Sequence, residues 1–472
     1  MKGFLKRWAL VLWPAVVLGM VIMPVASAMA KDYRALTPQT IKALKESFKL
    51  DARTTALLNA VTNNNTKDLA FNRLMFNKYN DIFNYKIKTK GITNQKQSGR
   101  CWLFAGLNIM RPAVMKKFNL DKFEFSENYL FFWDKLEKAN MFLEAIIETK
   151  NKPFDDRELS LLVENPVPDG GWWEYVVDLM DKYGAVPKSA MPETKNSSNT
   201  RAMNALINKI ARHDAIVLRD MAKRGKSATQ LRKKKLEMLK TIYRVLALHL
   251  GVPPEQFTWR CEDKDGKIVE GTYTPVSFYK EAVGVKLSDY LPIIDHPIHP
   301  YGKHYRIKYS RNMSDVPDID FVNLKIDRLK EFALKSLLAG EPVWFAADVG
   351  KENDYKEGIM AVGIYDYQSL FGIDASLSKA DRVRLRDSTP NHAMVFIGVD
   401  TLGGRPLKWL VENSWGTDRG NKGYWTMYDN WFDEYVFAVI INKAYLPDDV
   451  TALFKTKPIT LPAWDPMRDM YR

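Results

Sequence analysis

The chain has 472 residues, of which 46% are hydrophobic and 12% are aromatic, and it carries a net charge of +14 with only two cysteines. This composition excludes an intrinsically disordered chain, which has few aromatic residues, and a small disulfide-stabilised protein, which has many cysteines. The length predicts two or three domains, and the positive charge favours anionic partners without indicating a fold.

The first thirty residues have the order of an export signal. Three cations among the first seven residues precede an uncharged, mostly apolar run at 8–25, and the motif Ala26-Ser-Ala28, overlapping Ala28-Met-Ala30, follows. This order predicts a secretory signal peptide over 1–30 and a mature protein that starts near Lys31 and is periplasmic or secreted. An uncleaved anchor, which would be the protein's only membrane contact, and a cytoplasmic location are the alternatives.

Apolar residues at helical spacing dominate the first half of the chain. They predict helices at Thr37–Thr62, Cys101–Met115, Phe125–Ile147 and Trp173–Tyr183. The region Arg201–Ala247 has thirteen Lys or Arg residues against three acidic residues, together with an apolar stripe, which predicts a basic helical hairpin broken at Gly225. A Pro- and His-rich segment, Leu291–Tyr305, reads as loop, and a further helix is expected at Ile326–Leu338.

The last third of the chain changes character. Runs rich in β-branched and aromatic residues predict strands at Pro342–Ala347, Ala393–Val399, Lys408–Glu412 and Tyr435–Ile441. Because helices come first and strands last, the pattern indicates an α+β architecture rather than alternating βαβ units.

Cys101 stands at a turn-to-helix junction, directly after Ser98-Gly-Arg. A lone cysteine is most often a small core residue, and a bridge to Cys261 is a second alternative. At the start of a helix, however, unpaired backbone N–H groups and the helix dipole favour the thiolate, which is the nucleophilic form. Gln95 lies six residues earlier, and its amide is a candidate second donor beside the Cys101 N–H for a developing oxyanion.

A thiolate needs a base, and His392 is the best placed of the six histidines because it stands directly before the strand Ala393–Val399. Asn413 follows the strand Lys408–Glu412, so adjacent antiparallel strands would bring its side-chain oxygen to the imidazole, with Trp415 covering that bond. The other reading of this Asn-Ser-Trp-Gly segment is an ordinary turn.

A second group of histidines was considered as a metal site. His296, His299 and His304 lie near Asp295, but their spacing matches no compact ligand pattern, so neither a metal nor another cofactor is predicted.

Together these motifs resemble the papain-like cysteine peptidases, and among them the bleomycin hydrolase and bacterial aminopeptidase C family. The resemblance covers Leu36 to Met467 and is carried by Thr93–Asn108, Phe125–Asn140, Pro166–Thr194, NHAMVFIGVD, VENSWG and Leu461–Pro466. His392 lies 291 residues after Cys101, and the basic helical region between them corresponds to the family's helical insertion.

The resemblance implies a two-lobe papain-like fold of the α+β class with a large helical insertion. After the leader or anchor (1–30), the expected parts are an N-terminal helical arm (31–90), a helical lobe (91–195), the insertion (196–325), a β-rich lobe (326–450) and a C-terminal arm (451–472).

By the same resemblance, Cys101 would be the nucleophile, His392 the base and acid, Asn413 the orienting amide and Gln95 the oxyanion donor. The backbone of Gly170 and Gly171 would line the substrate cleft, with Trp415 beside it. Ser98 occupies a position where secreted papain-type enzymes often have a disulfide cysteine.

The family implies a cysteine aminopeptidase that cleaves peptides through a thioester, assembled as a homohexamer with the C-terminal arm in each cleft. An export-like leader and a longer, more charged tail, Met467–Arg472, depart from the family pattern. A thiol endopeptidase is the alternative activity. Nucleic acid, bound by the basic region Arg201–Ala247, is the less favoured partner.

Overall fold

The computed structural model describes residues 34–471, so the predicted leader lies outside the described residues. The chain divides into two compact units, Met1–Leu69 and Ala70–Arg472. Within the described part of the chain, no helix combines the length and the apolarity needed to cross a membrane.

The first unit contains two helices where the sequence pattern predicts one. The helix α1 (Pro38–Ser47) begins as expected, because the Thr37 side chain caps it and Pro38 occupies its first turn. The chain is then extended at Phe48, and Asp51 caps a separate helix, α2 (Ala52–Asn63). The predicted single helix is therefore two helices, because Asp51 acts as the N-cap of a second one. The short α3 (Thr66–Ala70) follows.

The second unit holds the helices that carry the predicted motifs. They are α4 (Arg73–Phe76), α5 (Cys101–Asn108), α6 (Arg111–Lys117), α7 (Glu127–Glu148), α8 (Arg157–Glu164), α9 (Trp173–Tyr183), α10 (Lys195–Ser198), α11 (Arg201–Lys223), α12 (Ala228–Leu250), α13 (Pro275–Ser277), α14 (Ile326–Leu338), α15 (Tyr367–Phe371), α16 (Lys379–Arg384), α17 (Asp429–Tyr435) and α18 (Asp448–Leu453).

The second unit also contains one large, mostly antiparallel sheet. Its strand order is β14-β5-β6-β4-β13-β7-β10-β11-β12-β9-β8, with β1 paired to β10. The strands are β1 (Tyr85–Lys86), β4 (Tyr290–Ile294), β5 (Lys303–Ile307), β6 (Asp320–Asn323), β7 (Val343–Ala347), β8 (Asn353–Asp354), β9 (Ile359–Met360), β10 (His392–Leu402), β11 (Arg405–Glu412), β12 (Tyr424–Tyr428), β13 (Val436–Asn442) and β14 (Ile459–Leu461).

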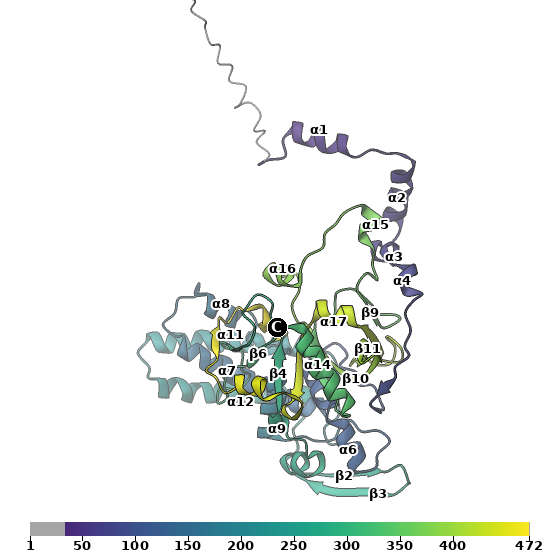
Figure 1. The fold of residues 1–472 in the computed structure, drawn as a ribbon. Coiled ribbons are helices and arrows are strands. Elements are labelled where there is room, and N and C mark those ends of the chain that lie inside the picture. The colour runs from purple at the N-terminus through teal and green to yellow at the C-terminus, as the bar shows by residue number, and fades with distance from the viewer. Residues whose placement is uncertain (1–33, 472) are drawn as a thin grey trace, which may run out of the picture. The chain divides into compact units, whose positions relative to one another are not determined.

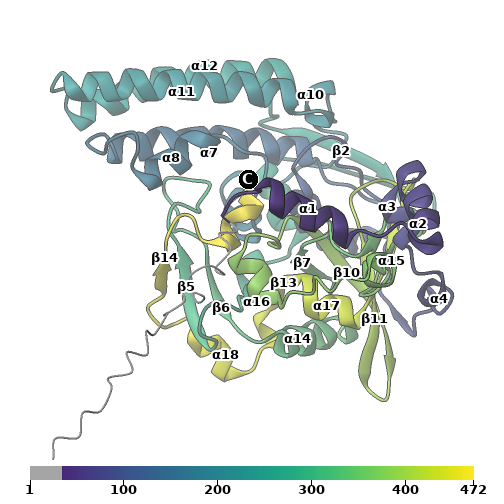
Figure 2. The same ribbon diagram turned by 90° about the horizontal axis from the view of Figure 1, so that it is seen from above.

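The basic region forms the predicted hairpin. The helices α11 and α12 run beside α7 (Figures 1 and 2) and are joined at Gly225, whose φ of +77° suits glycine. Ser227 and Gln230 form a capping box that starts α12. Each helix buries its apolar stripe, while most of its Lys and Arg residues face outward.

Two expectations for the middle of the chain were wrong. The segment Leu291–Tyr305 was expected to be a loop, but it contains most of β4 and part of β5. The residues between its prolines still have backbone N–H groups that can pair in a sheet. The insertion is also not helical throughout, since its later part forms a hairpin of β2 (Phe257–Glu262) and β3 (Ile268–Tyr273) and contributes β4, β5 and β6 to the large sheet.

The helices and the sheet meet through buried aromatic residues. Trp344 of β7 donates its indole N–H to the carbonyl of Trp102 in α5, at 3.1 Å. Trp102 and Trp344 are both fully buried, as is Trp173 of α9, which packs near Trp344. This contact fixes the start of α5 against the central strands, and the α+β prediction is confirmed.

Candidate active site

Cys101 is the first residue of α5 and is 7% exposed. Burial raises the pKa of its thiol to about 11, although backbone amides of Ala393, Trp102 and Cys101 itself oppose this by favouring the thiolate. The contact with Ala393 places the sulfur beside β10, at the residue after His392. Both cysteines are free, so no bridge joins Cys101 to Cys261.

His392 opens β10 and is held by the neighbouring strand. Its Nε2–H donates to the side-chain oxygen of Asn413 at 2.8 Å, which leaves Nδ1 as the nitrogen that can accept a proton. Pairing of β10 with β11 brings the two residues together, as the strand pattern predicts. The Trp415 ring lies over the imidazole, with centroids 4.5 Å apart.

Burial also governs the charge of His392. It lowers the pKa of the imidazole to about 4, partly offset by the hydrogen bond to Asn413. Between pH of about 4 and about 11, the thiol and the imidazole together therefore hold one proton. Moving that proton from sulfur to Nδ1 charges both groups at once, and the opposite charges then stabilise each other. This neutral resting state differs from the thiolate that the helix start favours, because burial outweighs the effect of the backbone amides.

Gln95 connects the loop before Cys101 with the loop after Asn413. Its side-chain N–H donates to the Ser98 carbonyl at 2.6 Å, and its side-chain oxygen accepts from the Ser414 hydroxyl at 2.7 Å. Its backbone N–H donates to the Ser414 carbonyl. The sequence reasoning missed Ser414, although its position next to Asn413 was a usable signal. The oxyanion role of Gln95 stays a prediction.

Gly170 and Gly171 are buried directly against α5. A Cβ on Gly171 would lie 2.7 Å from the Trp102 ring, so only glycine permits this approach. The Gly170 carbonyl accepts a hydrogen bond from the Lys138 ammonium at 2.7 Å. That Gly170 and Gly171 pair with a substrate peptide stays a prediction. Because the Gly170 carbonyl already binds Lys138, a peptide could pair only with the other backbone groups of the two glycines.

The histidines considered for a metal separate into different contacts. His304 lies beside Asp320, and Asp295 forms an ion pair with Lys379. His296 and His299 instead contact opposite oxygens of Asp465, at 2.9 and 3.0 Å.

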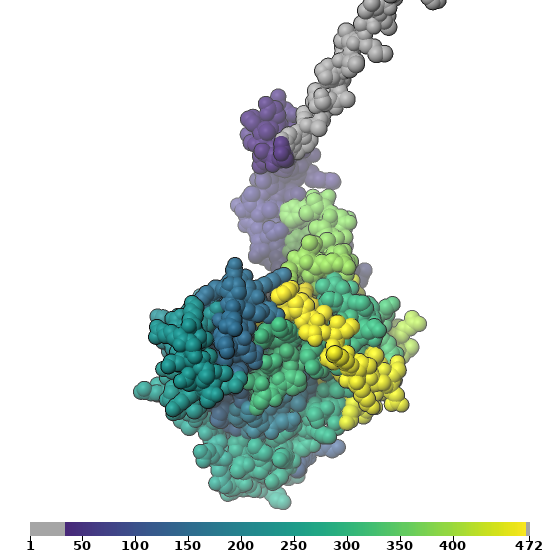
Figure 3. Space-filling model, turned by 90° about the vertical axis from the view of Figure 1, so that its left-hand side faces the viewer, coloured from purple at the N-terminus to yellow at the C-terminus, as the bar shows by residue number. Residues whose placement is uncertain are grey.

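These three side chains anchor the C-terminal segment. Their ligand atoms lie within 4.8 Å of one another, which is compatible with a metal, but both contacts have hydrogen-bond geometry. The segment that carries Asp465 follows β14, which pairs with β5, and Asp465 itself is buried. Figure 3 shows the C-terminal part of the chain in yellow on one face of the second unit. No role for Asp465 was predicted from the sequence.

The Peptidase C1-like family model matches residues 35–468. The chain belongs to this family. Among curated relatives, an Aminopeptidase C of Lactobacillus delbrueckii subsp. lactis is 43% identical over 391 residues, 82% of this chain and 87% of the relative. The bleomycin hydrolase of Homo sapiens is 38% identical over 445 residues, 92% of this chain and 98% of the relative.

The fold has a solved counterpart. The crystal structure of PepW from Lactobacillus rhamnosis HN001 superposes with a TM-score of 0.90 at 40% identity, covering 92% of this chain and 99% of that one. The predicted resemblance is confirmed, and this member of the Peptidase C1-like family is a cysteine-type peptidase with the papain-like architecture.

Proposed function

We propose that the chain is a cysteine aminopeptidase in which Cys101, His392, Asn413 and Gln95 perform the chemistry. One observation carries this assignment: the buried His392–Asn413 pair directs Nδ1 away from Asn413, while the neighbouring Ala393 amide contacts the Cys101 sulfur. A nucleophile, a base and an orienting amide thus occupy one buried place.

In the first half of the reaction, the sulfur attacks the carbonyl carbon of the N-terminal residue of a peptide. The thiol proton moves to His392 Nδ1, and a C–S bond forms as the carbonyl oxygen takes the negative charge. The Cys101 N–H and the Gln95 amide would stabilise that oxyanion, and loss of one such donor typically costs about 10²–10³ in rate. His392 then protonates the leaving amine, the C–N bond breaks and a thioester remains.

In the second half, His392 takes a proton from water and the resulting hydroxide attacks the thioester. The C–S bond breaks, the sulfur recovers its proton from the imidazolium, and the N-terminal amino acid is released. Asn413 keeps the Nε2–H directed away from the reaction throughout, so that Nδ1 serves both transfers.

Removal of single N-terminal residues is supported by the curated relatives named Aminopeptidase C. The test compares a fluorogenic peptide with a free α-amine and the same peptide with its amine blocked. We expect cleavage of the free-amine peptide alone, abolished by iodoacetamide. Equal cleavage of both peptides would replace aminopeptidase with the endopeptidase alternative, and insensitivity to alkylation would contradict the cysteine mechanism.

We further propose that the enzyme is exported and forms a homohexamer. The leader pattern at 1–30 supports export, and the family resemblance supports the hexamer. N-terminal sequencing of the protein from its native host tests cleavage near Lys31, and light scattering tests the mass. The exposed cations of α11 and α12 leave nucleic acid as a less favoured partner, which a filter-binding assay across salt concentrations would detect.

A further inference from the structure

The residues just before Cys101 are held between two carboxylates that have no assigned role. On one side, the Gly99 N–H donates to the Asp169 side chain at 3.1 Å. A Cβ on Gly99 would lie 2.8 Å from the Asp169 Cβ, so the contact requires glycine. The carboxylate therefore reaches the backbone two residues before the nucleophile.

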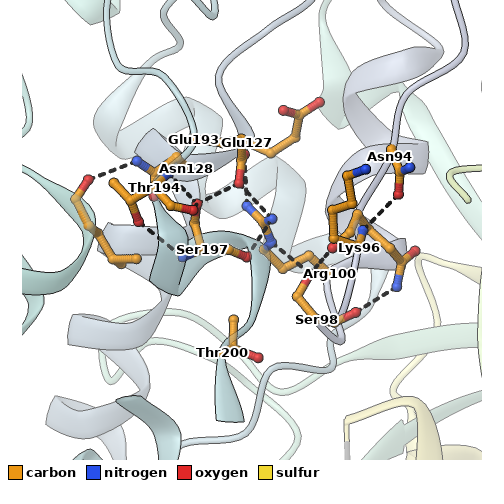
Figure 4. A network of polar contacts seen from close by, with 12 residues as sticks. Asn94, Lys96, Ser98, Arg100, Glu127, Asn128, Glu193, Thr194, Ser197 and Thr200 are labelled. Carbon is orange, nitrogen blue, oxygen red and sulfur yellow. Dashed lines mark hydrogen bonds and ion pairs between the residues drawn. The ribbon is translucent and has the colours of Figure 1, made fainter. Parts of the chain in front are cut away.

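On the other side, Arg100 forms a two-pronged ion pair with Glu193. The guanidinium nitrogens lie 3.0 and 2.8 Å from the two carboxylate oxygens, and Arg100 is 0% exposed (Figure 4). The same guanidinium donates to the Ser197 carbonyl and the Ser98 hydroxyl. Such paired, fork-shaped contacts fix orientation as well as distance. We call Asp169 and Glu193 the carboxylate clamp.

Buried ammonium groups stabilise the Asp169 side of the clamp. Lys135 of α7 lies 2.5 Å from the Asp169 carboxylate and also donates to the Val167 carbonyl. Lys138 donates to the Pro168 and Gly170 carbonyls, and Trp102 donates to the Asp169 carbonyl. Four successive carbonyls of this turn, those of residues 167–170, are therefore bound from α5 and α7.

The beginning of the helical insertion contributes the remaining contacts. Thr200 and Asn204 donate to the Asp169 carboxylate at 2.5 and 2.7 Å. The Gln97 N–H donates to the Ser198 carbonyl, and the Gln97 carbonyl accepts from the Thr200 N–H. The insertion thus touches the loop before the nucleophile directly.

Both carboxylates of the clamp are charged in the folded protein. Burial opposes their charge, but Lys135 and its hydrogen bonds hold the pKa of Asp169 well below its ordinary value. Arg100 likewise lowers the pKa of Glu193 against the cost of burial. Replacing Asp169 or Glu193 with a neutral side chain therefore removes a negative charge from the clamp.

We propose that Asp169 and Glu193 are positioning residues of the peptidase: they fix the loop Gln95–Cys101, and with it the two donors that receive the oxyanion. This inference rests on the proposed function. Gln95 and the Cys101 N–H lie on either side of the clamped residues, so a shift of Gly99 or Arg100 moves the donors relative to each other. Misplacement by about 1 Å can cost about 10²-fold in rate.

The test uses Asp169→Asn with Glu144→Gln as a matched control. Glu144 of α7 is another buried carboxylate with basic partners, Arg232 and Lys235, but it contacts neither the loop nor the turn. Active sites are counted by iodoacetamide alkylation of Cys101 in a Cys261→Ser background, because both cysteines are free; alkylation uses no oxyanion donor. We expect Asp169→Asn to lower kcat per counted site by about 10–100-fold, with KM and the alkylation rate changed by less than about 3-fold.

A merely structural role would reduce the number of alkylated sites and leave kcat per site unchanged, which would overturn the proposal. An equal loss of kcat in Glu144→Gln would overturn it too. If Asp169→Asn does not fold, Thr200→Val removes one hydrogen bond to the same carboxylate, and an unchanged kcat per site there would also overturn it. A wild-type enzyme that is alkylated at Cys101 but hydrolyses no peptide would instead refute the proposed function, and the clamp with it.

Discussion

The two proposed catalytic groups are held in contrasting ways. His392 begins a central strand, paired with β7 and β11, and its partner Asn413 lies 21 residues away. Cys101 follows a loop that is held by charged groups 70 and 93 residues away, Asp169 and Glu193. Backbone pairing thus orients the base, whereas buried ion pairs orient the nucleophile, so the two sides should respond differently to mutation.

Removing the sulfur gives the largest effect. Cys101→Ala should lower hydrolysis of a free-amine peptide by at least about 10⁴-fold, because no other group can form the thioester. Cys261→Ser is the matched control, since this cysteine lies in β2 and should leave the rate unchanged. Appreciable turnover by Cys101→Ala, measured after removal of contaminating peptidases, would refute the nucleophile.

A second change tests how much a buried ion pair stabilises the strand side, where backbone pairing orients the base. Arg111 of α6 pairs with Glu412, the residue before Asn413, and both side chains are buried. Arg111→Met should lower the free energy of unfolding by about 3–5 kcal/mol, because it leaves Glu412 buried without its counter-ion.

Urea unfolding measures this change, with Lys240→Met as control because the Lys240–Glu237 pair is exposed. If Arg111→Met were as stable as the wild type, the buried Arg111–Glu412 pair would contribute nothing to the stability of the strand side.

The orienting amide should matter less than the nucleophile. Asn413→Ala is expected to lower kcat by about 10–100-fold, equivalent to about 1.4–2.7 kcal/mol, because Asn413 orients His392 and does not react. Since the Asn413 bond raises the pKa of His392, its loss should also move the acidic limb of the kcat/KM profile to lower pH. An unchanged rate and pH profile would contradict the role.

The smallest effect is expected at the C-terminal anchor. Burial opposes the charge of Asp465, but contacts with His296 and His299 hold its pKa well below the ordinary value. This carboxylate therefore stabilises the fold above the unfolded pKa of about 3.9, and the contribution is lost as the pH falls through the folded pKa.

Asp465→Asn should cost about 1 kcal/mol at pH 7, and its difference from the wild type should shrink in acid. Thermal unfolding at several pH values measures it, and hydrogen exchange locates it. A difference that grew in acid would contradict this assignment.

Sequence reasoning predicted the strand side more completely than the loop side. Periodicity located α7, α9, α11, α12 and α14, and the order of two strands was enough to pair His392 with Asn413. The clamp could not be predicted, because Asp169 and Glu193 sit in a turn and before a short helix, where acidic residues are usually solvated. Only folding brings them to Gly99 and Arg100.

The missed strands have a similar cause. The segment containing β4 and β5 is rich in proline, which local rules assign to loops, yet β4 gains its partners β6 and β13 from distant parts of the chain. The sequence also pointed to one helix over Thr37–Thr62, because apolar spacing continues across a break that Asp51 creates by capping.

The contacts from Thr200 and Asn204 to Asp169 have a consequence for engineering. The segment that starts the insertion is not a detachable module, since excising it would also remove hydrogen-bond donors from beside the reactive thiol. A shortened enzyme that lacks most of the α11–α12 hairpin would have to keep Thr200 and Asn204, or gain other hydrogen-bond donors to Asp169.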